Sequence, residues 1–122
     1  TFIQMLIAGG TVSGRQYLKP QTLALMRSNQ LADGVFVKLP GLKMPDTVFG
    51  LGFAINTSAA QPPFESSKRE YYWGGMAGTH SWVAPDAGIA GLCFTQRMPG
   101  FWHPFSHDFR RFVYSEKQRV TT

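Results

Sequence analysis

The sequence is poor in features that mark several classes of protein. It has one cysteine, Cys93, so no disulfide can form within the chain. Charged residues make up only 16% of it, and although 12 basic against 7 acidic residues give a net charge of +5, the basic ones are dispersed and form no dense stripe. No apolar run is long enough to span a membrane. We therefore predict no internal disulfide, no nucleic-acid partner and no membrane segment in this chain.

Cysteine and histidine chemistry also finds little support. Cys93 lies between two apolar residues with no cation or helix N-terminus nearby in sequence to favour a thiolate, so it is predicted to be a small core residue. His103 and His107 are four residues apart, with Asp108 beside the second, and could bind a metal from one helix face. Pro104 indicates, however, that a helix only begins there, and neither a Glu after the first His nor a third ligand is evident. The sequence thus predicts no metal and no cofactor.

Two short helices are predicted near the N-terminus. Phe2, Met5 and Leu6 recur at helical spacing, and two successive glycines end that helix. Pro20 suits the first turn of a second helix, which is expected to end near Asn29.

A longer helix is predicted near the C-terminus. Phe105, Phe109, Phe112 and Val113 have the spacing of an amphipathic helix whose aromatic stripe packs on a sheet. Three basic residues of this segment are expected to face water: Arg110, Arg111 and Lys117.

The middle of the chain predicts an antiparallel sheet of about three strands, at residues 49–55, 71–83 and 89–96. In the first of them bulky and small residues alternate. Residues 32–47 lack periodicity and are expected to form an ordered loop, whereas residues 57–68, rich in Ser, Ala and Pro, are expected to be a mobile connection. The fold class predicted is α+β, with the sheet flanked by N-terminal helices and a C-terminal helix.

A glycine-rich stretch at residues 73–86 is the most informative part of the sequence. It reads Trp-Gly-Gly-Met-Ala-Gly-Thr-His-Ser-Trp-Val-Ala-Pro-Asp. Glycine weakens a strand, and its usual reason there is the close approach of a ligand or a neighbouring element to the backbone. Residues 85–88 have turn chemistry and lead into a further strand-like run. The stretch is therefore predicted to form a β-hairpin and to be the wall of an active site.

This hairpin resembles the late hairpin of the serine β-lactamase and penicillin-binding-protein-like superfamily, and most of all its esterase-type branch, the family VIII carboxylesterase-like proteins. The following run, Gly-Leu-Cys-Phe-Thr-Gln-Arg-Met-Pro, carries the same resemblance. Four earlier segments look like family segments in the family's order: residues 2–10, 18–26, 29–31 and 49–53. The resemblance implies that residues 1–122 are the C-terminal segment of a single β-lactamase-like (transpeptidase-like) domain. Because the chain begins inside an apolar helical pattern, we expect an upstream part to precede it.

The family's catalytic motifs do not occur in the sequence. Its chemistry starts from Ser-x-x-Lys, in which the serine attacks a carbonyl and the lysine helps to remove its proton. The sequence has no Ser-x-x-Lys, and neither Tyr-x-Asn nor Ser-x-Asn. The resemblance therefore implies that the upstream part carries the nucleophile and is the partner of this segment. The chain alone is predicted to be inactive.

The resemblance also assigns site residues within the glycine-rich stretch. Trp73, Gly74 and Gly75 stand where the family often has Lys-Thr-Gly, so an apolar wall replaces the cation that would hold a substrate carboxylate. Met76 matches the position whose backbone N–H forms part of an oxyanion hole. His80 is an alternative general base, but the family uses Lys and Tyr for proton transfer, which favours a hydrogen-bonded structural histidine.

We predict a serine hydrolase, a carboxylesterase or β-lactamase-related enzyme, that cleaves a small-molecule ester or amide through an acyl-enzyme. The alternative is a non-catalytic binding or peptidoglycan-associated protein that keeps the fold. A third hypothesis is a free-standing small binding domain that is monomeric and folds cooperatively. The sequence gives no localisation, because a targeting signal would lie outside these residues.

Overall fold

The computed structural model describes residues 2–58, 67–100 and 104–121. Both predicted N-terminal helices are confirmed, α1 at Phe2–Ile7 and α2 at Pro20–Met26. Gly9 and Gly10 have positive φ, and the Gly10 N–H donates to the Met5 carbonyl at 2.8 Å, which ends α1. Between the helices lies a two-stranded ribbon of β1 and β2, at Thr11–Val12 and Arg15–Gln16.

A second ribbon lies in residues 32–47, where only a loop was predicted. Its strands are β3, Val37–Leu39, and β4, Leu42–Met44. The turn between them is Pro40–Gly41, and Gly41 has φ +75°. The loop prediction was wrong because it treated this proline and glycine as strand breakers rather than as the turn of a short hairpin.

The main sheet has five antiparallel strands in the order β5-β6-β7-β8-β9, so the prediction of about three strands was too low. The predicted strand 49–55 is in fact the end of β5, Thr47–Phe49, a bend at residues 50–53 and the start of β6, Ala54–Asn56. Gly50 and Gly52 cause this: a Cβ on Gly50 would lie 2.1 Å from the Met26 carbonyl oxygen, and Gly52 has φ +88°. The glycines thus turn the chain and are not the small face of a strand.

The predicted strand 71–83 is likewise two strands. They are β7, Tyr71–Gly74, and β8, His80–Ala84, joined by a turn at residues 75–79. The last strand, β9, is Ile89–Cys93 and pairs with β8 as the hairpin prediction required. The predicted connection at 57–68 lies for the most part outside the described residues.

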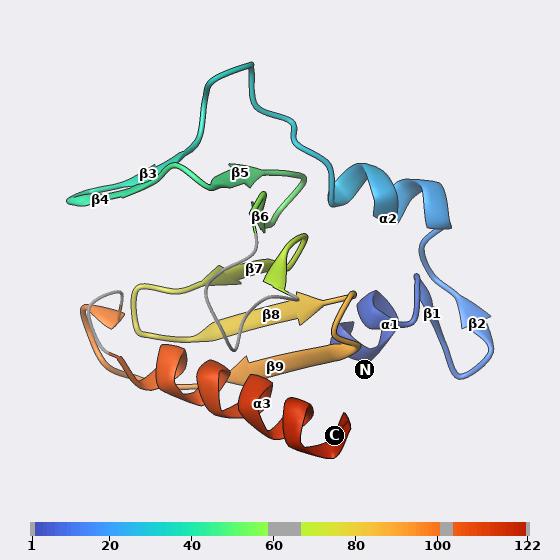
Figure 1. The fold of residues 1–122 in the computed structure, drawn as a ribbon. Helices are drawn as coiled ribbons and strands as arrows, with labels where there is room; N and C mark the ends of the chain where they lie inside the picture. The colour runs from blue at the N-terminus through green and yellow to red at the C-terminus, as the bar shows by residue number, and fades with distance from the viewer. Residues whose placement is uncertain (1, 59–66, 101–103, 122) are drawn as a thin grey trace.

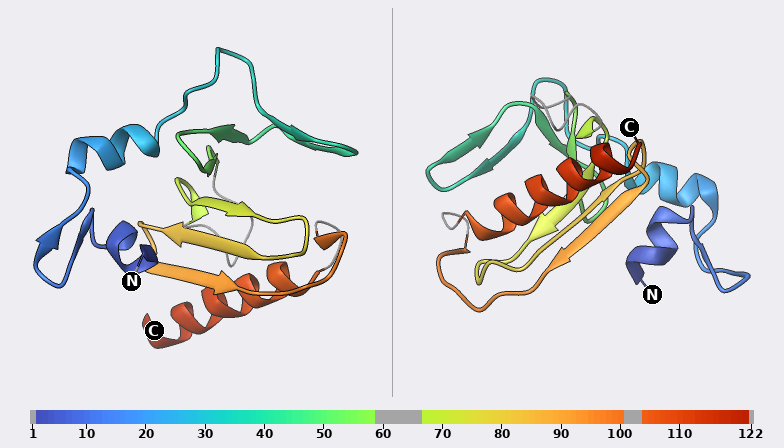
Figure 2. Two further views of the ribbon diagram at one scale, coloured as in Figure 1. Left: turned by 180° about the vertical axis from the view of Figure 1, so that it is seen from behind. Right: turned by 60° about the horizontal axis from the view of Figure 1, so that its bottom comes forward.

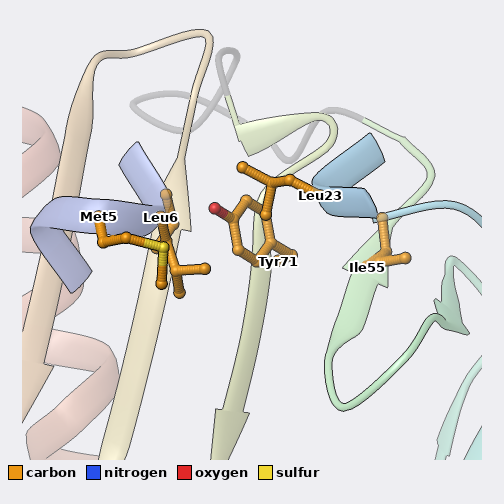
Figure 3. Close-up of a cluster of buried hydrophobic side chains, with 6 residues drawn as sticks. Met5, Leu6, Leu23, Ile55 and Tyr71 are labelled. Carbon is orange, nitrogen blue, oxygen red and sulfur yellow. The ribbon is translucent and has the colours of Figure 1, made fainter. Parts of the chain in front are cut away.

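One face of the sheet packs against α1 and α2. Tyr71 and Val83 are opposite each other on β7 and β8 and share this face. Together with side chains from both helices they form the buried cluster in Figure 3, whose members are Met5, Leu6, Leu23, Ile55, Tyr71 and Val83. These helices therefore fix the start of β7.

The other face packs against α3, Phe105–Thr121, which confirms the predicted C-terminal helix. Figure 1 and Figure 2 show α3 running along β8 and β9. The buried residues on this face are Trp82, Ala84 and Tyr114. No helix among the described residues combines the length and the apolar character needed to cross a membrane.

The face that α3 turns to the sheet matches the predicted one only in part, since Phe109 and Val113 pack against the core as predicted. Phe105 and Phe112 are more than half exposed, whereas Tyr114 is buried. Arg110 was expected to face water, but its side chain is only 14% exposed and pairs with Glu70. The prediction was wrong because the inner face also contains a polar side chain with a buried partner, which apolar spacing does not register. Arg111 and Lys117 are exposed, as predicted.

Candidate active site

The predicted site residues lie at the end of β7 and in the turn that follows it. Because β6 pairs with β7 only at Tyr71 and Tyr72, the next two residues of β7 extend beyond β6. The site lies where β7 ends, β8 begins and β9 ends (Figure 1). A depression of about 290 Å³ is lined there by residues of all three strands and of the turn: Trp73, Gly74, Gly75, Thr79, His80, Ser81, Leu92, Cys93 and Phe94.

The turn at residues 75–79 is tightly closed and depends on its glycines. The Gly75 N–H donates to the Thr79 carbonyl at 2.8 Å, and the Gly78 N–H donates to the Gly75 carbonyl at 2.9 Å. A Cβ on Gly75 would lie 2.4 Å from Thr79 Oγ1, and Gly78 has φ +84°. The close approach that the sequence predicted is therefore made by the turn itself.

A segment after β9 holds the turn from outside. Thr95 Oγ1 donates to the Ala77 carbonyl at 2.7 Å, and the Arg97 N–H donates to the same carbonyl at 2.9 Å. The Gly100 N–H donates to the Met76 carbonyl at 2.6 Å. Sequence reasoning missed this support, although the Pro-Gly pair at 99–100 was a signal of a turn.

The Met76 backbone is therefore held in place while its own amide stays available. Its carbonyl accepts from Gly100, and no backbone hydrogen bond from its N–H is found within the described residues. The Met76 side chain is 58% exposed. A backbone N–H held in a fixed turn is one requirement of an oxyanion hole, and that role of Met76 remains a prediction.

Trp73 presents an aromatic surface to the depression. Its ring packs edge-on against Phe49, with ring centroids 5.0 Å apart, and it is 40% exposed. Trp82, by contrast, is fully buried and contacts Phe109 of α3. Trp73 therefore leaves part of its ring exposed, and its contact with substrate remains a prediction, while Trp82 belongs to the core.

His80 packs as an aromatic ring. Its centroid is 5.8 Å from Tyr72, 5.4 Å from Trp82 and 6.0 Å from His107. Its Nδ1 atom is buried and has no hydrogen-bond partner among the described residues. The hydrogen bond expected of a structural histidine is therefore not seen at this atom. Burial, and then the nearby charges of His107 and Arg110, lower the pKa of His80 to about 4. The imidazole is therefore neutral at pH 7.

The other candidate ligands and nucleophiles do not assemble. His103 lies outside the described residues, and within those residues no three His, Cys, Asp or Glu side chains could hold a metal ion together. Cys93 is buried, as predicted, and this burial raises the pKa of its thiol. A buried thiol with a raised pKa fits the predicted role of Cys93 as a small core residue.

A buried ion pair behind the site was not predicted. Glu70, directly before β7, is held by Arg110 and Tyr114 of α3. Desolvation raises the pKa of this carboxyl group, against the opposing effect of Arg110 and the hydrogen bond from Tyr114. The only sequence signal was an acidic residue next to an aromatic strand. The pair links α3 to the strand that carries the site.

No protein-family model matches the chain. An uncharacterized protein of Mycobacterium tuberculosis is 37% identical over 81 residues, which are 66% of this chain and 19% of that protein. The chain therefore spans less than a fifth of this curated relative.

Several solved structures contain the same fold. Simvastatin synthase (LovD) from Aspergillus terreus matches with a TM-score of 0.71 and 21% identity, over 94% of this chain and 32% of that one. EstCE1, a hydrolase with promiscuous acyltransferase activity, matches with a TM-score of 0.69 and 25% identity, over 92% of this chain and 27% of that one. A β-lactamase from Mycobacterium bovis matches with a TM-score of 0.63 and 28% identity, over 93% of this chain and 42% of that one.

Proposed function

We propose that this chain, which has the fold of the C-terminal part of serine β-lactamase and penicillin-binding-protein-like enzymes, supplies the late active-site strand of a serine hydrolase. The observation that carries the proposal is the Met76 amide, which makes no backbone hydrogen bond within the described residues and lies in a turn held by three hydrogen bonds from the segment after β9. A donor held rigidly before the reaction stabilises the charge that develops on a carbonyl oxygen.

The nucleophile is proposed to lie elsewhere in the protein, on a Ser-x-x-Lys motif that this chain lacks. Its serine oxygen would form a bond to the substrate carbonyl carbon, and the serine proton would pass by way of the lysine to the leaving alcohol or amine. Water would then release the acid and restore the serine. In both steps the Met76 N–H would donate to the oxygen that bears the negative charge.

Trp73 is proposed to favour neutral esters over anionic β-lactams. An indole at this place offers apolar contact and no charge to a substrate carboxylate. Among the described residues, no Lys, Arg, Asp or Glu side chain lines the depression beside it. An esterase-type specificity is therefore the finer form of the proposal.

The test is covalent labelling of the longest protein that carries this chain. Its intact mass is measured under denaturing conditions before and after treatment with an alkyl fluorophosphonate, and the labelled peptide is identified. We expect one phosphonyl group on the serine of a Ser-x-x-Lys motif and hydrolysis of p-nitrophenyl butyrate that the reagent abolishes.

A protein that carries no such serine, stays unlabelled and hydrolyses no ester would contradict the proposal. It would instead be the non-catalytic binding or peptidoglycan-associated relative. A variant with the motif serine changed to alanine is the matched control, because it should keep the fold and lose both the label and the activity.

A further inference from the structure

The hairpin of β3 and β4 has one apolar and one cationic face. Its register pairs Val37 with Met44, Lys38 with Lys43 and Leu39 with Leu42. Because successive residues of a strand point to opposite faces, the two lysines share one face and the four apolar residues share the other. Val37 is buried and its three apolar companions are partly buried, while both lysines are exposed.

The apolar face of this hairpin lies beside the candidate active site. Figure 1 and Figure 2 show the hairpin at the same end of the molecule as the turn between β7 and β8. A cavity of about 90 Å³ lies between them. Leu39, Leu42 and Met44 of the hairpin line it on one side, and Trp73, Gly74 and Gly75 of the site on the other; its lining also includes the polar residues Thr79, His80, Ser106 and His107.

The chemistry of this cavity suits an uncharged group. No Lys, Arg, Asp or Glu side chain lines it within the described part of the chain. Its two histidines have lowered pKa values, His80 at about 4, mainly because burial disfavours the imidazolium. The lysines of the hairpin belong to its other face.

We propose that the β3–β4 hairpin is the wall of an apolar subsite that binds the alkyl part of a neutral ester. This rests on the proposed function, since the cavity shares Trp73, Gly74 and Gly75 with the depression at the candidate active site. Leu42 and Gly75, the residue before Met76, line the same cavity, so the alkyl group of an ester bound at the Met76 amide would enter it beside Leu42. The subsite selects substrates by apolar contact and takes no part in bond making.

The test uses the full protein and a matched pair of variants, Leu42→Ser and Lys43→Ser. These neighbours lie on one strand and face opposite ways. kcat/KM is measured for p-nitrophenyl acetate, butyrate and hexanoate, and for ethyl and hexyl acetate. In one of the two series, kcat/KM of the native protein should increase about fourfold for each buried methylene group. Leu42→Ser should flatten that gain, and Lys43→Ser should keep it.

The two ester series identify the part of the substrate that the subsite holds. A gain with acyl length assigns it to the acyl chain, and a gain with alcohol length assigns it to the alcohol. Leu42→Trp should shorten the optimal chain because it fills the cavity, and circular dichroism checks that every variant is folded. Equal chain-length gains in Leu42→Ser and the native protein would overturn the inference while ester hydrolysis itself still stood.

A binding measurement separates this inference from the proposed function. Butyramide and hexanamide are neutral and react far more slowly than esters, so their dissociation constants can be measured by calorimetry before turnover. If no ester is hydrolysed but hexanamide binds more tightly than butyramide, and only Leu42→Ser removes the difference, the subsite stands and the hydrolase fails. If neither amide binds and no chain-length effect is seen, the inference is overturned.

Discussion

The guanidinium of Arg110 holds the carboxylate of Glu70 across 40 residues of sequence. Arg110 Nε lies 3.0 Å from both carboxylate oxygens, and the Tyr114 hydroxyl donates to Oε2 at 2.6 Å. The Glu70 side chain is 2% exposed. Since Glu70 directly precedes β7, this contact fixes α3 against the strand that leads into Trp73.

Arg110→Met should therefore destabilise the protein strongly. Removing one partner leaves a buried carboxylate without its counter-charge, which costs about 3–5 kcal/mol. Arg111→Met is the matched control, because its pair with Asp108 is more than half exposed on both sides and contributes at most about 1 kcal/mol. Urea unfolding measures both. Similar losses in the two variants would show that the buried pair does not stabilise the fold.

Stability should also fall in mild acid because of His80. Its pKa in the folded protein is about 4, against an ordinary 6.5, so between these values the unfolded state binds more protons. The free energy of unfolding should therefore decrease by about 2 kcal/mol from pH 7.5 to pH 5 on account of this residue. This contribution to stability is lost progressively as the pH falls from about 6.5 toward 4.

The variant His80→Phe tests this origin, since it keeps a ring among Tyr72, Trp82 and His107 but cannot titrate. Its unfolding free energy should depend less on pH than that of the native protein. His107→Gln is measured beside it because His107 also has a lowered pKa and faces His80. Glu70 has a raised pKa and acts in the opposite direction, so differences between variants are compared and not absolute profiles. Parallel profiles for His80→Phe and the native protein would contradict the prediction.

Local patterns predicted the helices and the strand that carries the site. Pro20 and the two glycines after α1 set boundaries that the structure keeps, and the apolar residues near Met5 face the core. The hairpin of β8 and β9 follows from the turn residues at 85–88. These features depend on a few neighbouring residues, so the sequence alone could show them.

The β3–β4 hairpin was missed although its turn is local, but the other missed features depend on residues far apart. Only glycine fits at position 50 because the Met26 carbonyl oxygen occupies the space of a side chain, and Arg110 is buried because it pairs with Glu70. No periodicity in either segment contains that information. The same is true of the candidate site. Its strand could be predicted from its glycines, but the hydrogen bond from the Gly100 N–H to the Met76 carbonyl could not.

Gly100→Ala should lower activity more than its effect on stability explains. A Cβ there would lie 2.1 Å from the backbone nitrogen of Gly78, so the turn at 75–79 must shift, at a cost of about 1–3 kcal/mol. Gly34→Ala should cost about 1–2 kcal/mol through its positive φ alone and meets no atom within 4 Å. Ester hydrolysis at saturating substrate compares the two. A similar kcat in both variants would show that the geometry of the turn at 75–79 does not affect catalysis.

Trp73→Lys should move the substrate preference toward anions. A lysine at this place would offer a charged hydrogen bond to a substrate carboxylate, which corresponds to about tenfold or more in relative kcat/KM. The ratio of a carboxylate-bearing β-lactam to p-nitrophenyl butyrate is the measurement. Trp73→Phe should retain the preference for the neutral ester because it keeps an aromatic wall beside Phe49. An unchanged ratio in Trp73→Lys would mean that this side chain does not meet the substrate.

Two substitutions at Met76 separate the role of its backbone N–H from the role of its side chain. Proline lacks an N–H, and Ser13 and Arg69 are the only non-glycine residues of the described part with positive φ, so Met76 has the sign of φ that proline needs. The hydrogen bonds that close the turn start from Gly75 and Gly78, and neither uses this amide. Met76→Pro should therefore fold and lose on the order of 100- to 1,000-fold in kcat for p-nitrophenyl butyrate. Met76→Ala keeps the amide and should stay within a few-fold of the native protein. If both variants are equally active, the oxyanion donor must be sought elsewhere; if both are equally impaired, the exposed side chain and not the backbone serves the reaction.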